Sequence, residues 1–228
     1  MTSFKEAVHQ LFSGRVFQRK EVLRNIHFTL YPGECLAVVG RNGSGKTTLL
    51  RLVCGITEPE TGRIVRRGTL APVLSLGAGL EPELTGLENI HLLSALAGFS
   101  QEEEKQLPAR VMAFSELSPE VLRMQVKRYS TGMMARLSFA LAMARKPDLL
   151  VVDEALAVGD AAFQDKCYQA IEEHIRRGGS LMLVSHAAAE VKRLCNRMLV
   201  LEKGQIQFDG SPDEGLRCYQ NILSEAPF

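Results

Sequence analysis

The sequence has 228 residues, of which 46% are hydrophobic and 23% are charged, and this ordinary soluble globular composition predicts one domain spanning residues 1–228. Its 27 Lys and Arg nearly balance its 26 Asp and Glu. This balance excludes a global basic field that would hold nucleic acid or an anionic bilayer, so no nucleic-acid partner is expected.

The cysteines and the N-terminal residues exclude further classes of protein. The five cysteines are scattered and never form a C-x-x-C pair, which argues against a disulfide framework and a zinc site and predicts reduced thiols. No run of about 18 uncharged apolar residues occurs, and the N-terminal segment lacks the layout of a signal peptide. We therefore expect a cytoplasmic chain that does not cross a membrane by itself.

Three strand-like segments predict a parallel sheet. Residues 34–40 form a short apolar run that ends in glycine, and residues 46–56 then place leucines and valine at helical spacing, which predicts a strand, a glycine loop and a helix. Residues 148–155 are continuous enough in Leu and Val for a strand covered on both faces, and residues 180–186 repeat that pattern. The expected fold class is α/β with a mainly parallel sheet.

A helical subdomain is predicted between two parts of this core. From about residue 80 to residue 145 the strand pattern disappears, and Leu, Ala and Met recur at three- and four-residue spacing. We predict a mainly helical insertion there, with the core formed by about residues 1–79 and 146–228. Residues 197–210 are expected to close the core as a β-hairpin that turns at Lys203-Gly204.

The segment GRNGSGKTT matches the phosphate-loop pattern G-x-x-x-x-G-K-[ST] in full. Its glycines let successive N–H groups point inward toward phosphate oxygens, and the positive end of the following helix adds to this attraction. The lysine supplies a charge for the outer phosphates, and the first threonine hydroxyl is the expected magnesium ligand. The predicted binding residues are Gly40, Arg41, Asn42, Gly43, Ser44, Gly45, Lys46, Thr47 and Thr48.

Polar side chains end the two strands that follow. Asp153 and Glu154 end the Val-rich strand, at the sheet edge where ligands gather; a solvated acidic pair is the alternative interpretation. Behind a phosphate loop, Asp153 is expected to hold magnesium through water and Glu154 to polarise the attacking water as general base. His186 ends the next strand, where it is either a packed or surface residue or a group near a γ-phosphate.

A second small-residue turn, YSTGM, comes directly before the helical run MMARLSFALAMA. Ser130 and Gly132 occupy the N-cap region, where serine and exposed N–H groups bind an anion or simply cap the helix. Because this turn lies at the far end of the helical subdomain, one chain is not expected to fold both turns onto a single nucleotide. Two copies arranged head to tail about a twofold axis would do so, which predicts a homodimer with ATP at the interface.

Together with AVGD at residues 157–160 and VSH at residues 184–186, these motifs resemble an ATP-binding cassette (ABC) ATPase over nearly the whole chain. The phrases GAGLEPELTGLENI, YSTGM and DEALAVGDAAFQDKC further resemble the ATPase subunits of capsule, O-antigen and teichoic-acid exporters. The resemblance implies a P-loop NTPase (RecA-like) core with an inserted helical subdomain, the ABC ATPase fold. It also implies ATP and Mg²⁺ as ligands and hydrolysis of ATP to ADP and phosphate.

The resemblance implies roles for single residues as well. Ser130 and Gly132 would touch the γ-phosphate of the partner's ATP, Asp160 would line the dimer seam, and His186 would act as the switch that senses γ-phosphate. Phe17 would stack on adenine, although a phenylalanine near a terminus is core or surface filler at least half the time.

One position departs from the family pattern. Leu76 stands where many ABC ATPases carry a glutamine that reaches magnesium and reports to the membrane partner. Because an apolar side chain cannot ligate magnesium, a different group or a water is expected to fill that role.

The implied function is that of the ATPase subunit that powers export of a lipid-linked polysaccharide. The chain would be peripheral to the cytoplasmic face of the cell membrane and would dock on an integral membrane permease. The segment from Glu81 to Glu83 is either an acidic docking edge or a solvated loop. Two rivals stay open: an ABC exporter ATPase for another cargo, such as a lipid, drug or ion, and a soluble ABC ATPase that acts on a ribosome or a DNA-repair partner.

Overall fold

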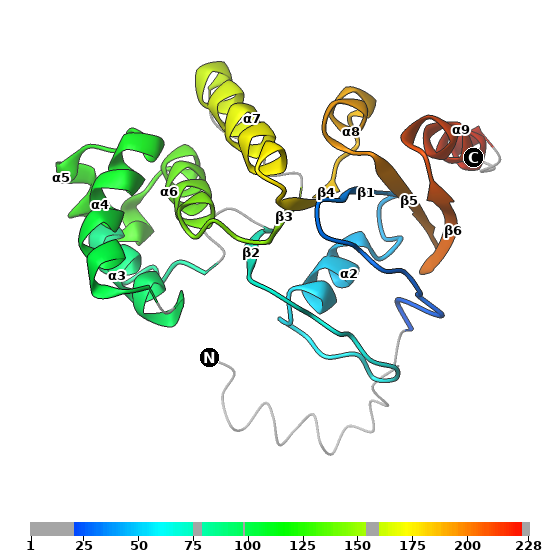
Figure 1. Ribbon diagram of the computed structural model, residues 1–228, viewed down its shortest axis with the longest axis horizontal. Helices are drawn as coiled ribbons and strands as arrows, with labels where there is room; N and C mark the ends of the chain where they lie inside the picture. Colours follow the sequence, from blue (N-terminus) through cyan, green and yellow to red (C-terminus); the bar gives the residue numbers. More distant parts are fainter. Residues whose placement is uncertain (1–20, 75–78, 98, 154–159, 225–228) are drawn as a thin grey trace, which may run out of the picture.

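Residues 21–74, 79–97, 99–153 and 160–224 are described by the computed structural model of the chain. A six-stranded sheet organises these residues, and helices lie on both of its faces (Figure 1). Within the same ranges, no helix combines the length and the apolar character that crossing a bilayer needs.

The sheet has the strand order β2-β3-β4-β1-β5-β6. All neighbouring strands are parallel except β6, which runs antiparallel to β5 and closes the sheet at one edge. The three predicted strands and the predicted hairpin are therefore confirmed. The strands are β1 (Cys35–Val39), β2 (Leu70–Val73), β3 (Leu149–Asp153), β4 (Ser180–Val184), β5 (Arg197–Glu202) and β6 (Gln205–Gly210).

Helices cover the two faces of the sheet unequally. Figure 1 shows α7, α8 and α9 over one face and α2 under the other, with α3 to α6 grouped beside the β2 edge. The helices are α2 (Lys46–Val53), α3 (Gly86–Ala97), α4 (Gln101–Ser115), α5 (Pro119–Leu122), the 3₁₀ turn η1 (Val126–Arg128), α6 (Thr131–Ala144), α7 (Ala161–Arg176), α8 (Ala188–Leu194) and α9 (Pro212–Ser224).

The central strands are buried on both faces because a parallel sheet is covered by helices above and below. In β1, Cys35, Ala37 and Val39 belong to the core under α7 and α8, whereas Leu36 and Val38 belong to the core that contains α2 residues. These five side chains are at most 3% exposed. A continuous apolar run, with no polar alternation, is the pattern that such burial requires.

The helices between residues 86 and 144 bury a core of their own, which includes Ile90, Leu107, Val111, Leu137 and Leu141. Helix α6 joins this group to the sheet, since it also contacts β2 and contributes a phenylalanine to the core under α7. The loss of strand pattern in this stretch correctly predicted helices.

Four elements were not assigned from the sequence: the strand β2 and the helices α7, α8 and α9. β2 has four residues, and one of them is Pro72, which cannot donate a hydrogen bond to a sheet ladder. The strand forms nevertheless because it lies at the edge of the sheet, where the missing donor is tolerated. The helix α9 near the C-terminus was not assigned either; it packs against β5 and β6.

Candidate functional site: the phosphate loop and its surroundings

The phosphate loop connects the end of β1 to the start of α2, as predicted. Gly45 is the N-cap of α2 with a left-handed backbone, φ 108°, and a Cβ there would lie 2.6 Å from Leu23 Cδ2. Gly40 approaches β5 so closely that a Cβ would lie 2.1 Å from the carbonyl oxygen of Leu201. Both glycines are thus required by local geometry, independently of any ligand.

Lys46 folds back over the loop. Its Nζ donates to the carbonyl oxygens of Gly40, at 2.7 Å, and Arg41, at 3.2 Å, and the residue is only 8% exposed. These contacts hold the ammonium group at the loop, where its predicted role as a point charge for a phosphate requires it. Gly40 and Arg41 therefore contribute carbonyl groups that orient the lysine.

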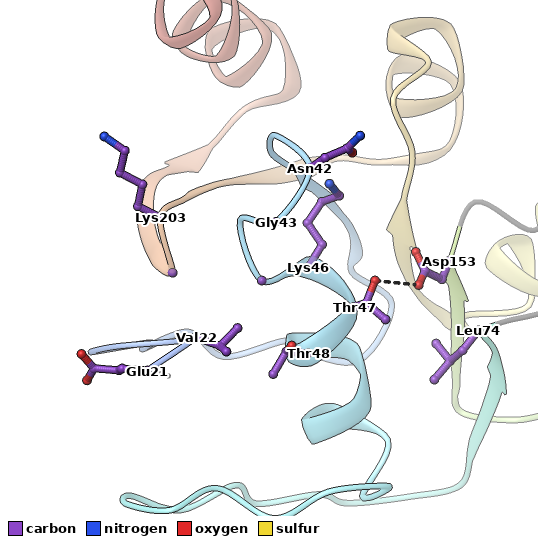
Figure 2. Close-up of a pocket in the computed structure, with 12 residues that line it drawn as sticks. Glu21, Val22, Asn42, Gly43, Lys46, Thr47, Thr48, Leu74, Asp153 and Lys203 are labelled. Atoms are coloured by element: carbon purple, nitrogen blue, oxygen red, sulfur yellow. Dashed lines mark hydrogen bonds between the residues drawn. The ribbon is translucent and has the colours of Figure 1, made fainter. Parts of the chain in front are cut away.

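Thr47 on α2 faces Asp153 at the carboxyl end of β3 (Figure 2). The Thr47 hydroxyl and Asp153 Oδ2 lie 3.4 Å apart. Hydroxyl and carboxylate oxygens are the donors that Mg²⁺ prefers, so this pair fits the predicted magnesium site. Across the part of the chain that the structure describes, no cluster of three His, Cys, Asp or Glu side chains offers a rival metal site.

Ser44 carries a buried hydroxyl group inside the loop. The residue is 3% exposed, and its Oγ has no hydrogen-bond partner among the described residues. A buried hydroxyl without a partner costs free energy, so such a group commonly has a ligand or water as its partner. Its position in the loop is consistent with a phosphate as that ligand.

An open pocket of about 820 Å³ surrounds the loop. Figure 2 shows Leu74 and Asp153 at one end of the pocket and Glu21 and Lys203 at the other. Besides residues of the predicted loop and Asp153, the lining includes five that the sequence analysis missed: Glu21, Val22, Leu74, Lys203 and Gly204.

The missed residues reach the pocket through tertiary contacts. Gly204, in the turn of the β5–β6 hairpin, donates its N–H to the carbonyl oxygen of Ser44 at 3.0 Å and accepts from Arg24 N at 2.9 Å. The sequence predicted the turn, but no local pattern indicated that it lies against the phosphate loop.

His186 lies two residues after the end of β4. Asp153 pairs with Val184 across the two strands, so the predicted neighbourhood of these strands is confirmed. His186 is exposed and does not line the pocket. The expected general base Glu154, the expected adenine contact Phe17, and Leu76 lie outside the described residues.

Ser130 is the N-cap of α6, with φ −65° and ψ 161°, and its Oγ accepts a hydrogen bond from Met133 N at 3.2 Å. Ser130 therefore caps α6, and its expected contact with a partner's ATP stays a prediction. Neither Ser130 nor Gly132 lines the pocket around the phosphate loop. The chain thus does not bring its two small-residue turns together by itself.

Asp160 is the N-cap of α7, and its Oδ1 accepts from Phe163 N at 3.0 Å. Its other oxygen accepts from the Arg136 guanidinium at 2.5 Å. These hydrogen bonds, first the one from the Phe163 backbone, lower the pKa of Asp160 below its usual value. The side chain is 62% exposed, so it is available to a partner although it is oriented within its own chain.

The proposed acidic edge is partly neutralised. Glu83 Oε2 accepts from Lys127 Nζ at 2.6 Å, and Gln125 Nε2 donates to the Glu83 carbonyl oxygen at 2.9 Å. The edge is therefore braced against the segment before Ser130, and its charge is lower than the sequence suggested.

Comparisons with known proteins agree with this geometry. A family model described as ABC transporter matches residues 23–157. The ABC transporter protein AbcA of Aeromonas salmonicida is 42% identical over 92% of this chain and 67% of its own length. The O-antigen export system ATP-binding protein RfbB of Klebsiella pneumoniae is 39% identical over 94% and 86%. The teichoic acids export ATP-binding protein TagH of Staphylococcus saprophyticus is 37% identical over 89% and 76%.

Two solved structures share the fold. The ATP binding subunit of an ABC transporter superposes with a TM-score of 0.78 at 26% identity, covering 92% of this chain and 91% of that one. A dimeric ATP-binding cassette in a post-hydrolysis state with ADP and Pi gives a TM-score of 0.70 at 23% identity, covering 84% and 90%. The family match over more than half of the sequence, and relatives that align with nearly all of it, show that this chain belongs to the ABC transporter family as an ABC-type ATPase.

Proposed function

We propose that this chain is the ATP-hydrolysing subunit of an ABC exporter whose cargo is a lipid-linked polysaccharide. The cargo is supported by relatives named for O-antigen export and for teichoic acids export, which align with 94% and 89% of this chain. The domain that carries this activity spans residues 1–228, with a helical subdomain at about residues 80–145 inserted into the core.

The observation that carries the ATPase assignment is the contact between Thr47 and Asp153, which joins the phosphate loop to the end of β3 at 3.4 Å. In the proposed site the triphosphate lies along the N–H groups of residues 40–48, with Lys46 on its outer phosphates. Thr47 and Asp153 would hold Mg²⁺, the latter through water, and this ion would neutralise charge on the phosphates.

The remaining site residues act on the attacking water, on the γ-phosphate and on the adenine ring. Glu154 accepts a proton from the attacking water as general base, and His186 contacts the γ-phosphate from the end of the neighbouring strand. Phe17 stacks on the adenine ring. The exposed position of His186 beside the end of β3 supports its part of this assignment.

Two copies form the active unit in this proposal, with Ser130 and Gly132 of one chain closing on the ATP held by the other. The support is that both residues sit at the start of α6, outside the pocket of their own chain. ATP can drive closure only because it binds the closed dimer better than the open one, and contacts from both chains supply that difference. Asp160 lies at the interface between the two chains in this proposal.

An integral membrane permease converts this cycle into transport, and the ATPase lies at the cytoplasmic face of the membrane. The docking site in this proposal is on the helical subdomain near residues 77–89. There the segment from Glu81 to Glu83 is held rigidly by hydrogen bonds to residues 125–127.

A mixing experiment tests the shared sites. Lys46→Ala chains and Ser130→Arg chains are each expected to lose ATP hydrolysis, and a mixture should recover it, because one intact composite site forms in each heterodimer. Activity is measured as Mg²⁺-dependent phosphate release. A mixture that stays as inactive as its two components contradicts the proposal that ATP is shared between chains.

The cargo needs a separate test in the host cell. Removal of the chain should leave lipid-linked polysaccharide inside the cell and deplete it from the surface, and the Lys46→Ala chain should not restore export. Normal surface polysaccharide in the absence of the chain would point to another cargo. Copurification with ribosomes or DNA, without an integral membrane protein, would favour a function outside transport.

A further inference from the structure

The turn that carries His186 is fixed from both sides by one serine hydroxyl. Ser185 is 5% exposed, and its Oγ accepts a hydrogen bond from Ala187 N at 3.0 Å. The same hydroxyl donates to Glu190 Oε2 at 2.5 Å. A short hydrogen bond from a hydroxyl to a carboxylate is among the strong ones, so Glu190 holds the backbone on either side of His186.

The second oxygen of Glu190 is used by another element. Tyr168, on α7, donates its hydroxyl to Glu190 Oε1. Burial, and then the hydrogen bond to Glu190, raise the pKa of Tyr168, so the phenol keeps its proton and stays a donor. The Arg193 guanidinium lies 4.9 Å from the centre of the Tyr168 ring and fixes its plane. Both oxygens of one carboxylate are therefore engaged by hydroxyl groups from different parts of the fold.

Helix α7 begins a few residues after the proposed catalytic base in the sequence. Its N-cap, Asp160, follows the segment that contains Glu154. Tyr168 lies two turns further along the same helix, on the side of the sheet that α8 also covers (Figure 1). Hydrogen bonds through Tyr168 and Glu190 thus connect α7 to Ser185, one residue before His186.

We propose that Glu190 is a positioning residue for His186: its carboxylate links α7 to the turn at the end of β4 and sets where the imidazole stands relative to the γ-phosphate. The inference rests on the proposed role of His186 in ATP hydrolysis. Tyr168 is the second member of the link, because its hydroxyl group connects α7 to the same carboxylate by a hydrogen bond.

Two matched variants test the link. Glu190→Gln keeps the shape of the side chain but cannot accept both hydroxyl protons as a carboxylate does. Glu172→Gln is the control, because Glu172 pairs with Arg193 at 2.7 Å in the same cluster without a hydrogen bond to the turn. The first readout is the NMR signal of the His186 ring, identified among the five histidines by its loss in His186→Ala.

The NMR result does not depend on catalysis. The His186 signal should move in Glu190→Gln and in Tyr168→Phe and stay in place in Glu172→Gln, while the melting temperature of each variant stays within about 4 °C of the parent. Equal shifts, or no shift, in Glu190→Gln and Glu172→Gln overturn the inference. Because this arm needs no ATP hydrolysis, its failure is distinct from a failure of the proposed function.

The kinetic arm asks whether the position matters for the reaction. Glu190→Gln should lower kcat by roughly tenfold or more with KM for ATP nearly unchanged, because a misplaced group weakens the transition state more than substrate binding. In single-turnover reactions, Glu190→Gln should cause no further loss in a His186→Ala chain. A loss of the same size in that background shows a role independent of His186 and sinks the proposal.

Discussion

Arg136 and Asp160 form an ion pair at 2.5 Å that joins α6 to the N-cap of α7. The same guanidinium donates to Glu116 at 2.9 Å and lies 4.4 Å from the centre of the Phe163 ring. Arg136 is 16% exposed whereas Asp160 is 62% exposed, so only the arginine side of this pair is shielded from solvent. One side chain therefore sets the distance between the helix that begins after Ser130 and the residue expected at the dimer seam.

Arg136→Lys should weaken this junction although it keeps the charge. Lysine lacks the planar fork that lets arginine serve two carboxylates and stack on a ring. We expect the free energy of unfolding to fall by about 1–2 kcal/mol, measured by urea denaturation, and kcat for ATP to fall several-fold in the dimer.

The matched control lies on α7 itself. Arg177 pairs with Glu173 at 2.6 Å but is 68% exposed, so Arg177→Lys should change the free energy of unfolding by no more than about 0.5 kcal/mol. Equal losses of stability in the two variants would show that the contacts of Arg136 contribute no more to stability than an exposed ion pair does.

Gly132→Ala separates the fold of one chain from the contact between chains. Gly132 has no positive φ, and the nearest atom to an added Cβ is Ser130 Oγ at 4.0 Å. Alanine is therefore accommodated in α6 and should raise the free energy of unfolding by about 0.5–1 kcal/mol. ATP hydrolysis should nevertheless fall at least about tenfold, if the methyl group stands where the partner's phosphate binds.

Gly40→Ala should change the free energy of unfolding in the opposite direction. A Cβ there would lie 2.1 Å from the Leu201 carbonyl oxygen, so the backbone must shift, and the free energy of unfolding should fall by about 1–3 kcal/mol. Comparison of the two alanine variants by urea denaturation and phosphate release distinguishes the two uses of glycine. Full ATPase activity in Gly132→Ala would remove Gly132 from the proposed composite site.

The phosphate site could be predicted from sequence because its chemistry is local. The cradle is encoded by a short run of glycines with Lys46 and Thr47, and the Val-rich strand places Asp153 at its carboxyl end. The position of Lys203 in the pocket lining and the contact of Gly204 with this cradle could not be predicted, since they depend on how a distant hairpin packs. The partner of Asp160 was missed for the same reason: Arg136 is on a different helix, 24 residues away.

Strand β2 shows a second limit. Pro72 and the short length of the segment argue against a strand when the sequence is considered alone. Only the position at the sheet edge, set by pairing with β3 from Leu70 to Val73, makes the strand possible. Patterns within a few residues predicted the central strands well because those strands are buried on both faces.

Buried thiols predict how stability responds to alkali. Burial raises the pKa of Cys167 and Cys195 to about 12, above the usual thiol value of 9.0. The unfolded chain therefore loses these protons first, so folding stability is fully present below about pH 9 and declines as pH rises toward about 12. The midpoint of urea denaturation should be lower at about pH 10 than at about pH 8.

A cysteine variant isolates this effect. Cys195→Ala removes one buried thiol and should be less stable at every pH because of the cavity it leaves, but its stability should decline less steeply with alkali. Identical slopes in the variant and the parent would assign the pH response to other groups.

The hairpin turn that braces the phosphate loop also bears on how the protein is made. Ser44 is translated well before Gly204, whose N–H supports the Ser44 carbonyl group. Synthesis proceeds from the N-terminus, so a nascent chain on the ribosome holds the loop sequence long before it holds the support. The brace between the hairpin and the loop can therefore form only after Gly204 has been translated.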